Sequence, residues 1–299
     1  MKVVPKVSFA SKIVSLIITL RGSKKMYSSK ELAQKYIEKK RIENQKPYKI
    51  PLKYKLFTKE LKIEGLPCFI ISGKGNKHIF YLHGGTYIEN PSPQHWDFLH
   101  KIHKETDANI LVPIYPKTPT YSFQESFDQV LKVYQKMYKL QNPSNLILMG
   151  DSAGGGFALA FSMLLKTKKL KQPSQIILIS PYLDLMLENP KIKDVEPSDK
   201  MLGVIGGREI AKQWSKNTNP NHYLLSPING DLKNLPPISL FIGTFDILWP
   251  DCVLLKEKAI KEGLSINYYE YIGMCHDFPL LPIPEGKLAV KQIVELIKH

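Results

Sequence analysis

Short hydrophobic runs recur from residue 53 onward, each four to six residues long and bounded by polar residues, proline or glycine. Their length and their content of β-branched and aromatic residues are typical of strands. Longer segments between the later runs are candidates for helices. We therefore expect strands at 54–57, 66–71, 79–82, 110–114, 146–149, 176–179, 239–242 and 266–271, and helices at 122–140, 153–166, 252–261 and 286–298.

Strands that alternate with helices predict an α/β fold with a mostly parallel central sheet and helices on both faces. No helix separates the first strands, so antiparallel pairing is expected there. Binding sites in such sheets form at the carboxyl ends of the strands. With 299 residues, of which 43% are hydrophobic, the chain can bury a full core.

Residues 1–50 have a different pattern, helical and separate from the sheet. Apolar residues from Leu32 to Ile37 follow helical spacing among charges within 30–43, and Pro47 and Pro51 close the section. The apolar stretch 13–20 is too short to span a bilayer and lacks a clear small-x-small cleavage site, so we interpret it as an amphipathic or buried helix of a lid. A second irregular segment, 185–223, is rich in Pro, Gly, Asp and Lys. It is either an insertion over the site or an ordinary surface excursion.

A G-x-S-x-G sequence, 150–154, directly follows the predicted strand 146–149. A chain that turns sharply from a buried strand into a helix needs glycines on both sides of the serine, because side chains there would collide with the two elements. Such a turn exposes the oxygen of Ser152, which we expect to be a nucleophile. Five residues with three fixed also occur by chance, so the interpretation depends on partners elsewhere in the chain.

A serine hydroxyl needs a base, and His276 is the best candidate among the eight histidines because it follows the last predicted strand. A buried carboxylate must orient the imidazole. Asp246, three residues beyond the strand-ending Gly243, fits this role. Asp251 is the alternative, although its position suits the start of a helix. Asp277 is too close to His276 in sequence to orient the ring easily.

Backbone N–H groups must also stabilise the oxyanion that forms when a carbonyl is attacked. Ala153 supplies one, and we expect Gly84 and Gly85, with Thr86 beside them, to supply the others. His83 is expected to support this loop, and Tyr87 to contact substrate. Tyr87, Trp214 and Tyr223 would crowd the pocket and favour a small acyl group.

Charge and cysteine content limit the alternatives. The net charge of +15 suggests nucleic-acid binding, yet only three of the 42 basic residues are arginine, and specific recognition depends on arginine forks. We therefore expect a solvated lysine surface and no specific nucleic-acid partner, and weak attraction to anionic substrates or membrane surfaces is the open alternative. Three cysteines without a C-x-x-C pair favour a reducing compartment, hence a cytoplasmic protein. Neither a metal nor a cofactor is expected.

The motifs at 83–87, 150–155, 243–248 and 276–278 resemble the hormone-sensitive-lipase-like branch of the α/β-hydrolase superfamily from about residue 53 to the end. That resemblance implies an α/β-hydrolase fold over 51–299, a helical cap formed by 1–50, and hydrolysis of short or medium acyl esters without a cofactor. Three positions depart from the family pattern: Thr86, Ile247 and Asp277 stand where glycine or alanine, proline and glycine are usual. These departures concern substrate range and leave the reaction type unchanged.

The sequence thus predicts a serine carboxylesterase for small-molecule esters that acts through an acyl-enzyme. An amidase or formamidase with the same three residues is the nearest alternative. A catalytically silent ligand-binding protein of the same fold is the alternative from another class. The sequence predicts no transmembrane segment, and a homodimer is compatible with it.

Overall fold

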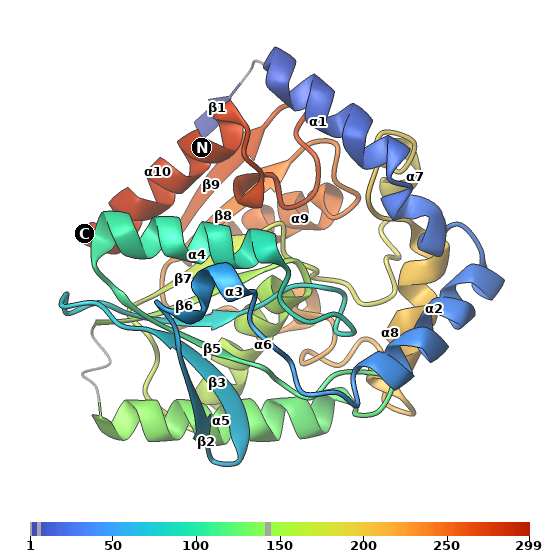
Figure 1. The fold of residues 1–299 in the computed structure, drawn as a ribbon. Coiled ribbons are helices and arrows are strands. Elements are labelled where there is room, and N and C mark those ends of the chain that lie inside the picture. Colours follow the sequence, from blue (N-terminus) through green and yellow to red (C-terminus); the bar gives the residue numbers. More distant parts are fainter. Residues whose placement is uncertain (1, 5–6, 141–144) are drawn as a thin grey trace.

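Nine strands form one sheet in the part of the chain that the computed structural model describes, residues 2–4, 7–140 and 145–299. Their spatial order is β1-β9-β8-β7-β6-β4-β5-β3-β2 (Figure 1). The pairs β2–β3 and β3–β5 are antiparallel and the other pairs are parallel, as expected from the missing helices near the first strands. The strands are β1 (Lys2–Val4), β2 (Lys59–Ile63), β3 (Leu66–Ile71), β4 (His78–Leu82), β5 (Asn109–Pro113), β6 (Leu146–Asp151), β7 (Gln175–Ile179), β8 (Ile238–Gly243) and β9 (Ile266–Tyr271).

Helices cover both faces of this sheet, because successive side chains of a strand point to opposite sides. In β4, Ile79 and Tyr81 pack in one core with α4 and α10, while Phe80 and Leu82 pack in the other with α5, α6 and α9. The helices are α1 (Phe9–Leu20), α2 (Lys30–Glu43), α3 (Leu52–Lys55), α4 (Pro93–Thr106), α5 (Phe123–Leu140), α6 (Ser152–Thr167), α7 (Ile192–Val195), α8 (Val204–Ser215), α9 (Trp249–Lys261) and α10 (Pro284–Lys298), with 3-10 turns η1 (Ser23–Tyr27), η3 (Pro227–Asn229) and η4 (Phe278–Leu280).

The two segments expected to lie outside the sheet meet in space. Helix α2 packs on α8, which lies within 185–223, and η1 also contacts α8. Figure 1 shows α1, α2, α7 and α8 grouped at one end of the sheet. Within 1–50, however, residues 2–4 pair with β9 as a parallel strand, so this part of the predicted cap belongs to the sheet.

Several expected elements differ from the structure. Residues 54–57 were expected to be a strand, but the chain there forms the short helix α3 and a turn after Pro51, with Leu56 and Phe57 exposed. Helices α4 and α8 were not expected. Strand β2 was missed because it lies at the edge of the sheet with charged, exposed side chains, which gives no hydrophobic run.

The apolar stretch 13–20 is part of α1, as expected for a helix, but it is not buried. Ser11 is the buried residue of α1, and most of its large apolar side chains face solvent. Among the described residues, no helix combines the length and apolar character that crossing a bilayer requires.

Candidate active site

Ser152 stands at the turn between β6 and α6, in the left-handed conformation with φ of 51°. The glycines beside it permit this turn, because a Cβ on Gly150 would lie 2.3 Å from the Gly154 carbonyl oxygen, and one on Gly154 would lie 2.0 Å from the Leu82 oxygen. A non-glycine residue held at positive φ marks strain that the surroundings must enforce. The strand, turn and helix expected from the G-x-S-x-G motif are all present.

His276 connects Ser152 to Asp246. Its Nε2 lies 2.8 Å from Ser152 Oγ, and its Nδ1 lies 2.8 Å from Asp246 Oδ2, although these residues are 124 and 30 positions away in the chain. The second oxygen of Asp246 accepts the Leu248 N–H at 2.9 Å, which holds the carboxylate in place. All three side chains are buried, so the expected exposure of the Ser152 oxygen is wrong. Ser152 lines a narrow cavity instead. This chain of hydrogen bonds is the geometry in which a histidine accepts a proton from a serine.

Asp251, the alternative acid, faces elsewhere. Its Oδ1 accepts a hydrogen bond from Asn189 Nδ2 at 2.8 Å. Burial raises its pKa to about 7, and Asn189 opposes this shift. The structure therefore brings Asp246, and not Asp251, to the imidazole.

Asp277 contacts the ring of His276 although the two residues are neighbours in sequence, a contact that the sequence analysis did not predict. Its left-handed φ of 50° turns the side chain back, and Oδ2 lies 3.2 Å from His276 Nε2. This is the nitrogen that faces Ser152, so Asp277 does not replace Asp246 in orienting the ring. Burial raises the pKa of Asp277 well above its usual range, while the nearby His276 opposes the shift.

Carboxylates on several sides set the proton affinity of His276. Burial lowers its pKa, but Asp246, Asp277 and Asp199 outweigh burial and raise the pKa to about 10. Asp199 comes from the 185–223 segment, and its Oδ2 accepts the Ile247 N–H at 3.0 Å. Burial and the neighbouring Asp246 raise the pKa of Asp199 to about 6.

The loop after β4 carries three consecutive positive φ angles, 106° at Gly85, 51° at Thr86 and 59° at Tyr87. Register places this loop beside the serine, since Leu82 pairs with Gly150 in the neighbouring β6. The Gly84 N–H donates to Asp151 Oδ1 at 3.0 Å, so it is already engaged. A Cβ on Gly84 would lie 2.9 Å from Ser152 Cβ. The absence of a side chain at Gly84 therefore lets the loop lie close to Ser152, but the Gly84 N–H is not available as an oxyanion donor. The remaining expected donors are the N–H groups of Gly85, Thr86 and Ala153.

His83 supports this loop from within. It is fully buried, its ring stacks on Tyr115 with centroids 4.3 Å apart, and its Nδ1 lies 2.8 Å from the Gly84 carbonyl oxygen. Burial, reinforced by the Lys117 charge, lowers the pKa of His83 to about 3. The imidazole is therefore neutral and makes a hydrogen bond within the loop.

Asp151 and His95 form a part of the site that sequence reasoning missed. Asp151 is fully buried, and its Oδ1 accepts from the Tyr81 hydroxyl as well as from the Gly84 N–H. Its Oδ2 lies 3.0 Å from His95 Nε2. Because the Ser92 N–H donates to His95 Nδ1, Nε2 carries the proton and donates to Asp151. The sequence did contain a signal for this cluster, because Asp151 lies within the buried G-x-S-x-G turn and a buried carboxylate requires hydrogen-bond donors around it.

The cavity beside Ser152 is narrow, with a volume of about 10 Å³. Tyr87 does not line it. Its ring stacks on Trp214, with centroids 4.3 Å apart, and only 2% of Tyr87 is exposed. Trp214 is also fully buried, and Tyr223 packs against the core. The lining residues are Tyr27, Thr86, Ser152, Tyr182, Leu187, Leu202, Gly203, Gly207, Ile247 and Leu248.

Cys275, next to the base, is packed. Burial and the neighbouring carboxylates raise the pKa of its thiol to about 12. The thiol therefore stays protonated at neutral pH, whereas a reactive cysteine requires the thiolate.

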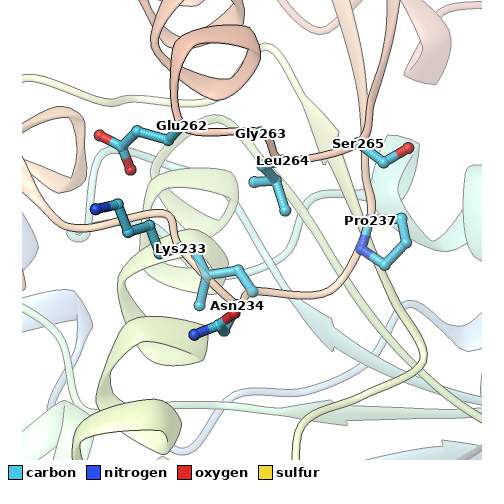
Figure 2. A pocket seen from close by; sticks show the side chains of 8 residues that line it. Lys233, Asn234, Pro237, Glu262, Gly263, Leu264 and Ser265 are labelled. Atoms are coloured by element: carbon cyan, nitrogen blue, oxygen red, sulfur yellow. The ribbon is translucent and has the colours of Figure 1, made fainter.

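A more open pocket of about 430 Å³ lies away from Ser152, between the loops that precede β8 and β9. Figure 2 shows Lys233, Asn234 and Pro237 on one loop and residues 262–265 on the other. These loops lead into the amino ends of their strands, opposite the carboxyl ends that carry Ser152, Asp246 and His276. The pocket is therefore separate from the candidate site.

Comparison with known proteins gives concordant results. A family model described as alpha/beta hydrolase fold matches residues 79–280. An esterase from Acinetobacter venetianus is 30% identical over 221 residues, which cover 73% of either chain. An acetyl-hydrolase from Streptomyces hygroscopicus is 28% identical over 218 residues, which cover 71% of this chain and 72% of the relative. The crystal structure of a candidate esterase from Staphylococcus aureus superposes with a TM-score of 0.89 at 32% identity, covering 93% of this chain and 96% of that one.

Proposed function

Because this chain belongs to the alpha/beta hydrolase family and is a carboxylic ester hydrolase, we propose that it acts as a serine esterase in which Ser152 forms an acyl-enzyme. The main support is the pair of 2.8 Å hydrogen bonds that join Ser152 to His276 and His276 to Asp246. These bonds provide both the base and the group that orients it.

In the first half of the proposed reaction, neutral His276 takes the proton of Ser152 as Oγ bonds to the ester carbonyl carbon. The N–H groups of Gly85, Thr86 and Ala153 donate to the resulting oxyanion, and each such donor is typically worth roughly 2.7–4 kcal/mol in activation free energy. The carbon–oxygen bond to the alcohol then breaks, and the alcohol leaves with the proton from His276. Asp246 stabilises the imidazolium meanwhile.

In the second half, water occupies the place of the alcohol. His276 takes a proton from the water as its oxygen attacks the acyl carbon. The bond to Ser152 Oγ breaks, Oγ recovers the proton from His276, and the free acid departs.

Residues of 1–50 and 185–223 act together as a cap over the site in this proposal. Tyr27 of η1 and Leu202 and Gly203 of the second segment line the cavity. The Tyr27 hydroxyl lies 2.9 Å from Thr86 Oγ1, which joins the cap to the proposed oxyanion loop. Lys24 Nζ donates to the Asp199 carbonyl oxygen at 3.0 Å, which joins the two cap segments.

The narrow cavity supports a preference for short acyl groups, since longer chains would require the cap to move. Tyr87 and Trp214 stack on each other outside the cavity lining, so they support the shape of the cavity without contacting substrate.

A panel of nitrophenyl esters from acetate to long chains tests the proposal on the wild type and on Ser152→Ala. We expect turnover of the short esters, declining with chain length and abolished by the substitution. Ser162→Ala is a matched control, because Ser162 is buried in the same helix α6 but bonds to Gln172. Undiminished turnover by Ser152→Ala would contradict the proposal.

Two further measurements separate the alternatives. Faster hydrolysis of a matched amide than of the ester would favour an amidase. Failure of a fluorophosphonate to label Ser152 in the folded protein would favour a silent ligand-binding protein.

A further inference from the structure

Helix α1 turns Ser11 and Val14 toward the protein, whereas most of its large apolar side chains face solvent. The Ser8 N–H and the Ser11 hydroxyl each donate to the Glu285 carboxylate at 2.5 Å, which attaches the start of α1 to α10. Ser11 is the buried residue of the helix, whereas Phe9 is 78% exposed and Leu20 is 77% exposed. This is the reverse of a surface helix in a globular protein, which buries its apolar face.

The exposed apolar residues form one continuous stripe. Phe9, Ile13, Leu16 and Leu20 follow one another at intervals of four, three and four, and such intervals place side chains on the same side of a helix. Ile17, which is also exposed, widens the stripe. In Figure 1, α1 runs along the outer edge of the molecule. Among the described residues, no element covers this stripe.

The segment of the sequence that carries the stripe has charged residues of one sign. Residues 1–30 contain seven lysines and arginines and no aspartate or glutamate, within a chain whose net charge is +15. Lys12, Arg21 and Lys25 are exposed on or just after α1. An apolar helical face combined with basic residues is the combination that binds the interface of an anionic bilayer.

We propose that α1 docks on the surface of an anionic lipid bilayer, with Phe9, Ile13, Leu16 and Leu20 inserted at the boundary of headgroups and acyl chains. The basic residues would contact the lipid phosphates. A second copy of this chain fits the same stripe less well, because a two-fold interface would bring two segments with seven basic residues each against one another. The charge complementarity therefore selects lipid.

Docking at this place brings the bilayer near the candidate site. Arg21 and Gly22 connect α1 to η1, and Tyr27 of η1 lines the cavity beside Ser152. Phe245 and Ile272 add exposed apolar area near the residues that lead into α1. Ile272 donates its N–H to the Val4 carbonyl oxygen, and a Cβ on Gly273 would lie 2.5 Å from Val7 Cγ2 and 3.9 Å from Phe245. Bilayer binding goes beyond the proposed hydrolysis and does not depend on it.

Sedimentation with vesicles tests the proposal on the full chain. One vesicle preparation contains phosphatidylcholine alone, and the other an equimolar mixture with phosphatidylglycerol. We expect the wild type and Ser152→Ala to sediment equally with the mixed vesicles, and both to bind phosphatidylcholine much less. High salt should weaken the binding, because the attraction to anionic lipid is screened.

Two sets of variants separate the stripe from the rest of the surface. Leu16→Ser with Leu20→Ser should reduce binding at least about tenfold, because two apolar side chains no longer insert. Ile260→Ser is the matched control, since Ile260 is 66% exposed on α9, and it should bind like the wild type. Lys12→Glu with Lys25→Glu should also weaken binding, whereas the exposed pair Lys168→Glu and Lys169→Glu should have a smaller effect.

Three results would overturn the proposal. The first is a wild type that fails to sediment with mixed vesicles. The second is unchanged binding by Leu16→Ser with Leu20→Ser. The third is a concentration-dependent dimer that this double variant abolishes in sedimentation equilibrium, because the stripe would then be an interface between copies. Loss of ester hydrolysis in Ser152→Ala with retained vesicle binding leaves the two proposals distinguishable.

Discussion

Asp277 Oδ2 lies 3.2 Å from His276 Nε2, the same ring nitrogen that lies 2.8 Å from Ser152 Oγ. The proposed base therefore has a carboxyl group on its reactive side as well as Asp246 on the other. When it is ionised, Asp277 in this position stabilises the imidazolium and disfavours the neutral ring, and its own raised pKa moves that ionisation to higher pH. Since only the neutral ring accepts a proton from Ser152, Asp277 influences the pH at which the enzyme becomes active.

Asp277→Asn should move the rise of kcat/KM with pH to lower pH. Nearby carboxylates raise the pKa of His276 to about 10, and removing one of them lowers that pKa, so more of the ring is neutral at a given pH. The measurement is kcat/KM for nitrophenyl acetate across the pH range. Asp128→Asn, a change at an exposed carboxylate on α5, should leave the profile in place. A shift to higher pH would contradict this account.

Asp246→Asn should reduce kcat by roughly 10⁴-fold, because the amide carries no negative charge to stabilise the imidazolium and, with its oxygen on the Leu248 N–H, presents its NH2 group to Nδ1 and favours the wrong tautomer. Asp251→Asn should cost far less, since Asp251 bonds to Asn189 and not to His276. Steady-state kinetics on both variants decides between the two carboxylates. Equal losses would show that the assignment of the acid is wrong.

Tyr27→Phe should lower kcat/KM modestly, because it removes the hydrogen bond between the cap and Thr86 at the proposed oxyanion loop. A single hydrogen bond is worth about 0.5–1.5 kcal/mol, which sets the size of the expected loss. Thr86→Ser, which retains the hydroxyl, should preserve activity better than Thr86→Val. If all three variants match the wild type with nitrophenyl acetate, the cap does not influence the loop.

Glu285→Gln should lower the thermal stability of the protein at neutral pH. Burial opposes the charge of Glu285, but hydrogen bonds from Ser11 and Ser8 outweigh it and hold its pKa below the usual range. A depressed folded-state pKa contributes stability above the unfolded pKa of about 4.3, and this contribution disappears as the pH falls through the folded-state pKa. The difference in Tm between wild type and variant should therefore shrink in acid, as melting curves at neutral and acidic pH would show. If the Tm difference between wild type and variant were the same at both pH values, the loss of stability would not come from the charge of Glu285.

The fold and the reacting groups could be predicted because their signals are local. Buried strands require continuous apolar runs, so seven of the eight expected strands, from 66–71 onward, are present. The expected strand at 54–57 is wrong, since a short apolar run after a proline does not distinguish a strand from a turn of helix. Edge strands such as β2 escape detection because solvent on their exposed faces removes the hydrophobic pattern.

The environment of the site could not be predicted, because it depends on which side chains meet in space. Asp151, His95 and Asp199 converge from separate segments, and only their buried contacts reveal that they surround Ser152 and Asp246. The hydrogen bond from the Gly84 N–H to Asp151 could not be predicted either. The glycines of the loop at 83–87 indicate that N–H donors lie there, but they do not indicate which N–H is already bonded within the protein.

The amino-acid sequence by itself determined an α/β architecture and a chain order of oxyanion loop, Ser152, Asp246 and His276, because strand periodicity and glycine-dependent turns are encoded within a few neighbouring residues. Only the tertiary structure decided that Asp277 reaches the base, that Tyr87 stands behind the cavity wall, and that α1 presents its apolar stripe to solvent. Amphipathic spacing predicts that a helix has an apolar face, but packing alone decides what that face contacts.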